Sequence, residues 1–166
     1  ITGPAILFSW PSSGSALSYL KDVEQAELAG SHFEDLLSTV RKAVGSHVKV
    51  HVAAHQLGIV PVLRGMQNMR QPPSSEIAQV GEIVAFSPDV SAQLFDDRCA
   101  AIKPSVGGIT VYGSSSNKMI DASQMLIGTP RAGKIGSDGP TPRSSRTCAR
   151  GRPVPSTRSG GWSDGL

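Results

Sequence analysis

Short apolar runs alternate with helix-forming segments along this chain, and that alternation constrains its fold more than any other feature. The apolar runs at residues 5–10, 48–54, 82–87 and 109–112 have the length and flanking turn residues of strands. Helical patterns lie between them, from about Ala16 to Val44 and from Leu57 to about Met69. Repeated β–α–β steps of this size favour a parallel sheet with helices on its faces. The sequence therefore predicts an α/β domain over residues 1–140, with a mostly parallel sheet.

The first helical region has the clearest periodicity. Five apolar residues fall on one stripe of a helix: Phe33, Leu36, Leu37, Val40 and Val44. We expect a break near Gly30, because Ser31 is a suitable N-cap and Glu34 would complete a capping box with it. The GG pair at residues 107–108 predicts a turn before the last strand.

The composition changes after Pro140. Residues 141–166 are mainly Ser, Arg, Gly, Pro and Thr, and they carry five arginines but a single acid, Asp164. The net charge of +3 therefore arises in this tail, and residues 1–140 are close to neutral. So few apolar residues predict a disordered basic tail. A shifted reading frame in a GC-rich gene is one hypothesis for its origin. Trp162 alone does not indicate a nucleic-acid partner.

A strand, a sharp turn and a helix follow one another between Val48 and Leu63. The segment Ala54-His55-Gln56-Leu57-Gly58 has the spacing of a nucleophile elbow, in which small residues flank an apex that projects clear of the strand. A serine normally stands at this apex, and the following helix N-terminus favours the nearby oxyanion. Here the apex is Gln56, whose carboxamide cannot attack an ester carbonyl at a useful rate.

Four motifs along the chain carry a resemblance to a known family. FSWPSSGSALSYLKD, AAHQLG, AFSPDV and TVYGSSSNK occur in that order. They resemble a bacterial family of α/β-hydrolase-fold proteins, esterase- and lipase-like and of unknown function, whose members read FSWPS-x-G, AHSMG, APD-[IV]-D and LY-x-SSND. The resemblance covers about residues 4–140 and implies a partial α/β-hydrolase fold, with a small ester as substrate in active relatives. An unrelated doubly wound domain is the alternative.

The catalytic residues that the resemblance implies are only partly present. Gln56 replaces the nucleophile, Asp89 in SPDV is a possible acid, and Asn117 replaces the acid at the alternative position. The family's catalytic histidine would follow these residues, yet none of the four histidines follows the apex: His32, His47, His51 and His55. We therefore interpret the chain as an inactive remnant of a serine esterase or lipase. Pro61 and Gly65, which weaken a helix interior, fit erosion of the helix behind the elbow.

The resemblance also implies a gap in the sheet. In this fold a further strand, preceding FSWPS, lies between the strand at 5–10 and the elbow strand. Without it, the two flanking strands would pair directly, leave backbone groups unpaired or borrow a strand from a neighbour, so we expect low stability or self-association. A non-catalytic interaction module with a basic tail is the alternative function.

No cofactor or metal is expected. His47 and His51 flank the elbow strand without a carboxylate or cysteine nearby, and Cys99 and Cys148 lack the spacing of a metal site. The segment 128–134 departs from a phosphate-binding loop at the residue after its lysine. No apolar run approaches the ~18 residues of a membrane span. The compartment stays open, with the cytoplasm favoured.

Overall fold

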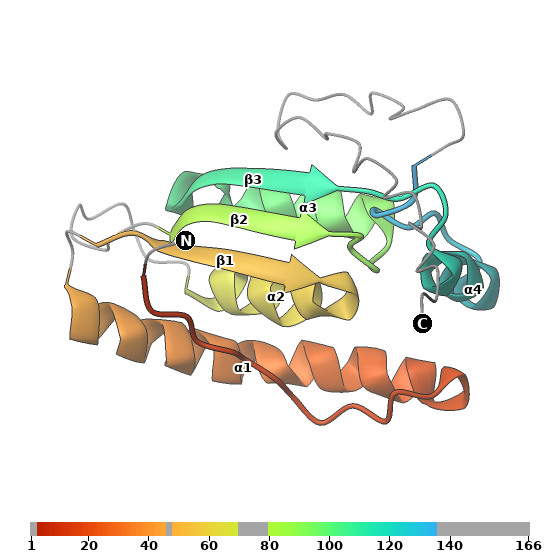
Figure 1. The fold of residues 1–166 in the computed structure, drawn as a ribbon, viewed down its shortest axis with the longest axis horizontal. Helices are drawn as coiled ribbons and strands as arrows, with labels where there is room; N and C mark the ends of the chain where they lie inside the picture. The colour runs from red at the N-terminus through yellow and green to blue at the C-terminus, as the bar shows by residue number, and fades with distance from the viewer. Residues whose placement is uncertain (1–2, 46–47, 70–79, 136–166) are drawn as a thin grey trace, which may run out of the picture.

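The computed structural model describes residues 3–45, 48–69 and 80–135, which form a layered α/β structure (Figure 1). The strands are β1 (Val50–His55), β2 (Val80–Phe86) and β3 (Val106–Tyr112), in the order β1-β2-β3 with both pairings parallel. The helices are α1 (Tyr19–Val44), α2 (Ile59–Asn68), α3 (Ala92–Ile102) and α4 (Lys118–Ile127). Short 3₁₀ turns are η1 (Ala16–Ser18), η2 (Gln56–Gly58) and η3 (Lys103–Ser105). This arrangement confirms the predicted α/β class with a parallel sheet.

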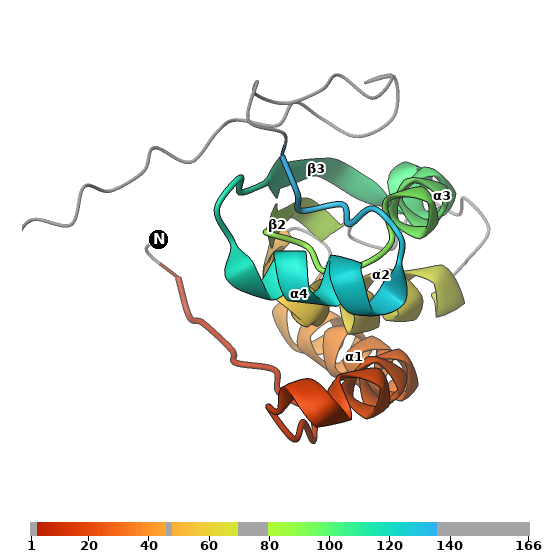
Figure 2. The same cartoon turned by 90° about the vertical axis from the view of Figure 1, so that its right-hand side faces the viewer.

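The helices α1, α2 and α3 lie on one side of the sheet, and α4 lies across the carboxyl ends of the strands (Figure 2). The core fills the space between the sheet and these helices. Its fully buried side chains include Ile59, Leu63, Ile83 and Ile102. Because all three strands run the same way, their carboxyl ends meet at one edge, where ligands bind in sheets of this kind.

The predicted break near Gly30 is wrong, because α1 continues without interruption from Tyr19 to Val44. Gly30 is buried in the contact between α1 and α2, where a Cβ would lie 2.4 Å from Cγ of Arg64. Ser31 does not cap a helix; its hydroxyl donates to the carbonyl oxygen of Leu28. The glycine therefore serves the approach of two helices, which local sequence signals do not report.

The helix behind the elbow is intact, which contradicts its interpretation as eroded. Pro61 is the third residue of α2, within the first turn, where backbone N–H groups have no intrahelical partner. Gly65 is buried against α1, and a Cβ there would lie 2.7 Å from the carbonyl oxygen of Gly30. Both residues thus suit their places in α2.

Residues 5–10 form no strand, which corrects the first predicted element. The segment takes no place in the sheet formed by the described residues, and a strand forms only where a neighbour satisfies its backbone groups. Two aromatic side chains anchor it instead. Phe8 makes an edge-on contact with Phe33 of α1, and Trp10 lies over Gly58 of η2. Leu7 remains 93% exposed.

The GG pair is part of β3 rather than a turn. A Cβ on Gly107 would lie 2.5 Å from the carbonyl oxygen of Gly81, and one on Gly108 would lie 2.4 Å from the carboxylate of Glu82. Glycine is therefore required at position 107, where the backbone of Gly81 lies over the strand, whereas at position 108 only the mobile end of the Glu82 side chain would have to move. The helices α3 and α4 were not predicted from the sequence. None of the helices in the described ranges is long and apolar enough to cross a membrane.

Candidate functional site

The elbow is built at the end of β1. Gln56 has a φ of +48°, a left-handed conformation that residues other than glycine rarely adopt. The chain then turns through η2 directly into α2, so the apex stands at the carboxyl edge of the sheet beside a helix N-terminus. Ala54 before it is buried, but a Cβ on Gly58 would meet only Trp10, at 3.7 Å. The turn therefore keeps its strained apex, although packing here does not demand glycine at position 58.

A second strained residue stands at the end of the adjacent strand. Ser87, which follows β2, has a φ of +45°, and its N–H donates to the carbonyl oxygen of Tyr112. The segment around Gly133 crosses over this turn, where a Cβ on Gly133 would lie 2.4 Å from the carbonyl carbon of Ser87. Backbone bonds from Ala132 to Val90 and from Gly133 to Pro88 fix the crossing. These bonds deliver Arg131 to the carboxyl end of β2.

Asp89 is buried, with 4% of its surface exposed, and both of its carboxylate oxygens are engaged. Oδ1 accepts hydrogen bonds from Nε of Arg131 and from the hydroxyl of Ser123, each at 2.6 Å. Oδ2 accepts from the hydroxyl of Tyr19 at 2.8 Å. The carboxylate of Asp89 therefore links the segment that carries Arg131 to α4, through Ser123, and to α1, through Tyr19.

Tyr19 also contacts the guanidinium of Arg131. Its hydroxyl accepts a hydrogen bond from Nη2 of Arg131 at 2.9 Å, and the same Nη2 donates to the backbone oxygen of Asp89. Burial, and then the hydrogen bond to Asp89, raise the pKa of Tyr19 to about 12. The phenol therefore keeps its proton and remains a donor to the carboxylate. We call Tyr19, Asp89, Ser123 and Arg131 the Asp89 cluster.

The backbone brings Asp89 and Gln56 together. The N–H of Asp89 donates to the carbonyl oxygen of Gln56 at 3.2 Å, so the apex and the possible acid are neighbours at the sheet edge. The carboxylate of Asp89, however, points to Tyr19, Ser123 and Arg131. Asn117 has another role: its Oδ1 accepts from the N–H groups of Met119 and Ile120 and caps α4.

A second carboxylate shapes the loop before α1. The carboxylate of Asp22 accepts from the backbone N–H groups of Ser13 and Gly14 and from the hydroxyl of Ser12. The bond from the Ser13 N–H is the main cause that lowers the pKa of Asp22 below its ordinary value. The loop of the FSWPSSG motif is thereby held against the first turns of α1, the helix that supplies Tyr19.

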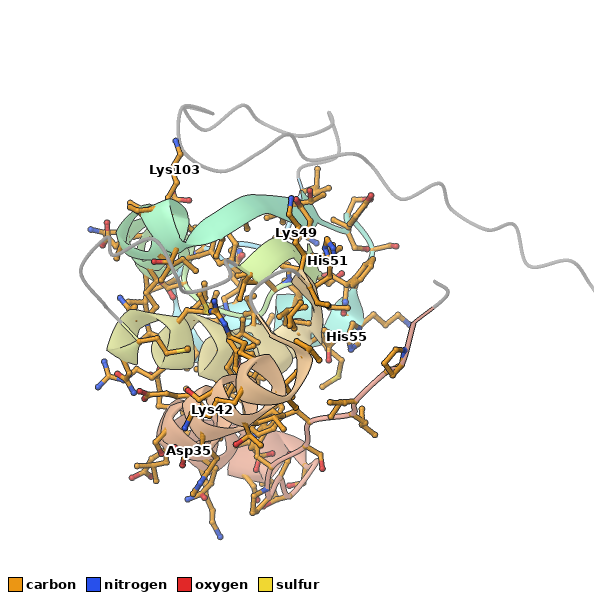
Figure 3. The ribbon with its side chains drawn as sticks, turned by 90° about the vertical axis from the view of Figure 1, so that its left-hand side faces the viewer. Asp35, Lys42, Lys49, His51, His55 and Lys103 are labelled. Carbon is orange, nitrogen blue, oxygen red and sulfur yellow. The ribbon has the colours of Figure 1, made fainter. Side chains whose placement is uncertain are left out.

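None of the described histidines is among the hydrogen-bond partners of the Asp89 carboxylate. His51 and His55 project from β1 on the side of the sheet opposite the helices (Figure 3). Nδ1 of His51 accepts a hydrogen bond from the N–H of Glu82, and His32 is exposed on α1. His47 lies outside the described residues. No group of three or more metal-ligating side chains comes together in the part of the chain that the structure describes.

A family model described as an alpha/beta hydrolase of unknown function (DUF900) matches residues 2–155. The chain belongs to this family. No curated protein and no solved structure matches it. In this α/β-hydrolase the elbow, Asp89 and Asn117 all lie at the carboxyl edge of the sheet, as expected for a site in the fold.

Sequence reasoning did not find the Asp89 cluster. Tyr19 lies in the FSWPSSGSALSYLKD motif and Arg131 in the segment 128–134, but the spacing of neither residue indicates its partner. The one available signal was an arginine in a Gly- and Pro-containing stretch that holds no acid. Its buried partner lies 42 residues earlier in the chain, and only the tertiary structure brings the two together.

Proposed function

We propose that this α/β-hydrolase is a catalytically inactive member of its family, related to serine esterases and lipases that act on small esters. The observation that carries the proposal is the carboxamide of Gln56 at the left-handed apex. A carboxamide is a hydrogen-bond donor and acceptor but supplies no ionisable oxygen or sulfur for attack on an ester.

The bonds of Asp89 support the same proposal. In a triad the acid accepts a hydrogen bond from the catalytic histidine and orients its ring. Asp89 instead binds Arg131, Ser123 and Tyr19. If its carboxylate turned toward a histidine, the buried guanidinium of Arg131 would lose its counter-charge. Asn117 carries no charge and its side-chain oxygen caps α4. We therefore assign Gln56, Asp89 and Asn117 to the former site, without a catalytic role in this chain.

Ester turnover tests the proposal. The wild-type chain should hydrolyse a short p-nitrophenyl ester no faster than buffer, and Gln56→Ser should not restore turnover, because loss of other triad members lowers rates by about 10⁴-fold or more. Gln93→Ser, an exposed position on α3, is the matched control. Turnover by the wild type that disappears in Gln56→Ala would overturn the proposal, because the amide would then take part in the reaction.

A fluorophosphonate probe adds an independent measurement. It should not label the wild-type apex, and rapid labelling of Gln56→Ser would show that a base and an oxyanion site remain. That result would contradict the proposed loss of the machinery and leave only the nucleophile missing.

A non-catalytic interaction module is the second candidate, and the side of the sheet opposite the helices, with Phe86 39% exposed on it, favours it. Deleting residues 141–166 separates two forms of this function. Binding through the basic tail should vanish on deletion and weaken with salt, whereas binding through the folded part should persist.

A further inference from the structure

The chain before α1 is bound to the rest of the molecule at only a few points. We call residues 3–15 the strap, and Figure 1 shows it as the dark red segment that runs along α1. No hydrogen bond joins residues 3–11 to another residue that the structure describes. Two neighbouring side chains of the strap are exposed, Ile6 by 61% and Leu7 by 93%. Segments with an unbonded backbone and few buried contacts are the ones that open most readily in a folded domain.

Two aromatic rings hold the middle of the strap. Phe8 meets Phe33 of α1 edge to face, with ring centroids 5.5 Å apart, and Trp10 stacks beside Phe8 at 6.4 Å. Both strap rings are only partly buried. Nε1 of Trp10 is nevertheless buried without a hydrogen-bond partner among the described residues. An unpaired buried donor disfavours this closed position, because water would satisfy the donor once the strap had opened.

The end of the strap next to α1 is fixed. The carboxylate of Asp22 accepts hydrogen bonds from the N–H of Ser13 at 2.8 Å, from the N–H of Gly14 at 3.1 Å and from the hydroxyl of Ser12 at 3.0 Å. Gly14 has a φ of +64°, which glycine adopts without strain. The chain therefore turns at a clamped point, and the part of the strap before that point is held by side chains alone.

Trp10 covers the turn that carries the apex. Apart from chain neighbours, its indole is the only described group within 4 Å of a Cβ built on Gly58, with Cη2 at 3.7 Å and Cζ3 at 4.0 Å. Gly58 lies two residues after Gln56, at the end of η2 and the start of α2. Removal of the indole would therefore open this side of the elbow to solvent.

We propose that the strap is a lid on the former site, which opens about the Asp22 clamp and uncovers the elbow. In the closed position the indole of Trp10 lies on Gly58. In the open position the rings of Phe8 and Trp10 leave, while the bonds from Ser12, Ser13 and Gly14 to Asp22 remain. A molecule that binds at the elbow from this side reaches it through the open state. This lid controls access to the elbow whether or not the chain turns over esters.

Thiol labelling at position 58 tests the proposal. The full chain with Gly58→Cys and Cys148→Ser is treated with a maleimide, and the rate is compared with that of the same chain unfolded in urea. The new Cβ makes an ordinary contact with Trp10, at 3.7 Å, so the substitution fits the closed position. Cys148→Ser alone supplies the background rate of the buried Cys99. The folded rate should be about tenfold to a hundredfold below the unfolded rate, as expected when two partly buried rings must leave.

Low concentrations of urea separate opening of the lid from unfolding. Opening exposes little surface, so the labelling rate should stay nearly constant below the unfolding transition. A rate that rises in parallel with global unfolding overturns the proposal, because position 58 would then be reached only when the fold is lost. A folded rate equal to the unfolded rate also overturns it, because the strap would then not cover the elbow.

Trp10→Ala in the labelled chain removes the cover. The labelling rate should rise about tenfold, because the main contact that holds the lid closed is lost. Leu28→Ala is the matched control, since Leu28 is 61% exposed on α1 outside the strap, and it should leave the rate unchanged. An unchanged rate in Trp10→Ala refutes the lid. Loss of the folded state in Trp10→Ala, detected by circular dichroism, refutes it too, because the strap would then belong to the core.

Amide hydrogen exchange locates the hinge. The amides of Ser13 and Gly14, bound to Asp22, should exchange more slowly than the amide of Ser9, which has no partner among the described residues. Equal protection of the three amides would exclude a hinge at the Asp22 clamp.

Discussion

The ion pair between Asp89 and Arg131 should be a main support of the folded state. The two side chains are each 5% exposed, and their closest atoms are 2.6 Å apart. Replacing Arg131 by Met retains most of the aliphatic volume but removes the cation. The carboxylate of Asp89 would then keep the hydroxyls of Ser123 and Tyr19 while losing its counter-charge in a buried place.

The expected loss is large on the scale of domain stability. Breaking a buried ion pair from one side costs about 3–5 kcal/mol. Folded domains are stable by about 5–15 kcal/mol in total. For a urea dependence of about 1–3 kcal/mol per molar, Arg131→Met should lower the unfolding midpoint by about 1 M or more. Lys134→Met is the control, because Lys134 pairs with Asp121 at the surface, where such pairs contribute about 0–1 kcal/mol.

A double-mutant cycle measures the interaction free energy between Asp89 and Arg131 apart from the contacts that each makes with other residues. The variant Asp89→Asn with Arg131→Met removes both charges, so its loss should be smaller than the sum of the single losses by roughly 2–3 kcal/mol. Urea unfolding followed by circular dichroism supplies all four free energies. A loss below about 1 kcal/mol for Arg131→Met, or additive single effects, would refute the structural role of the Asp89 cluster, because a buried pair cannot be that weakly coupled.

Three further predictions concern neighbouring residues. Because folding raises the pKa of Tyr19 from 10.0 to about 12, the folded state holds a proton that the unfolded state loses above pH 10. The free energy of unfolding should therefore fall between pH 10 and 12, by on the order of 1 kcal/mol for this half-buried group. Tyr19→Phe should abolish this loss in unfolding curves measured across that range. Gly65→Ala should lower the midpoint of thermal unfolding. A Cβ 2.7 Å from the carbonyl oxygen of Gly30 costs about 1–3 kcal/mol, which outweighs the gain in helix propensity of about 1 kcal/mol. An unchanged or raised midpoint would contradict the close packing of α1 and α2. Asn117→Ala should destabilise the fold by about 1 kcal/mol, because α4 loses its N-cap, whereas Asn117→Asp keeps a capping oxygen and should not destabilise it. Equal midpoints of chemical denaturation for the two variants would exclude the capping role.

Much of the fold follows from local pattern. The apolar runs of β1, β2 and β3 and the stripe of α1 have the periods of strand and helix, so the α/β class was predictable. The elbow was predictable for the same reason, since small residues around an apex between a strand and a helix describe a local turn. The left-handed φ of Gln56 confirms that turn with an amide at its apex.

Local pattern failed wherever a distant neighbour decides. A glycine and a serine at residues 30 and 31 carry the signals of a helix break, but Gly30 is there to let Arg64 and α2 approach. Residues 5–10 have the composition of a strand and form none, because no strand pairs with them in the described part of the chain. Hydrogen-bond pairing and helix contact are properties of two segments, and a single segment does not encode them.

The sequence alone determined the apex residue and the alternation of strand and helix segments, because each depends on residues within a few positions of one another. Only the tertiary structure decided the role of Asp89. Its partners come from Tyr19, Ser123 and Arg131, which lie 70, 34 and 42 residues away along the chain. A carboxylate takes its function from the charges and donors that surround it, and folding alone brings those groups together.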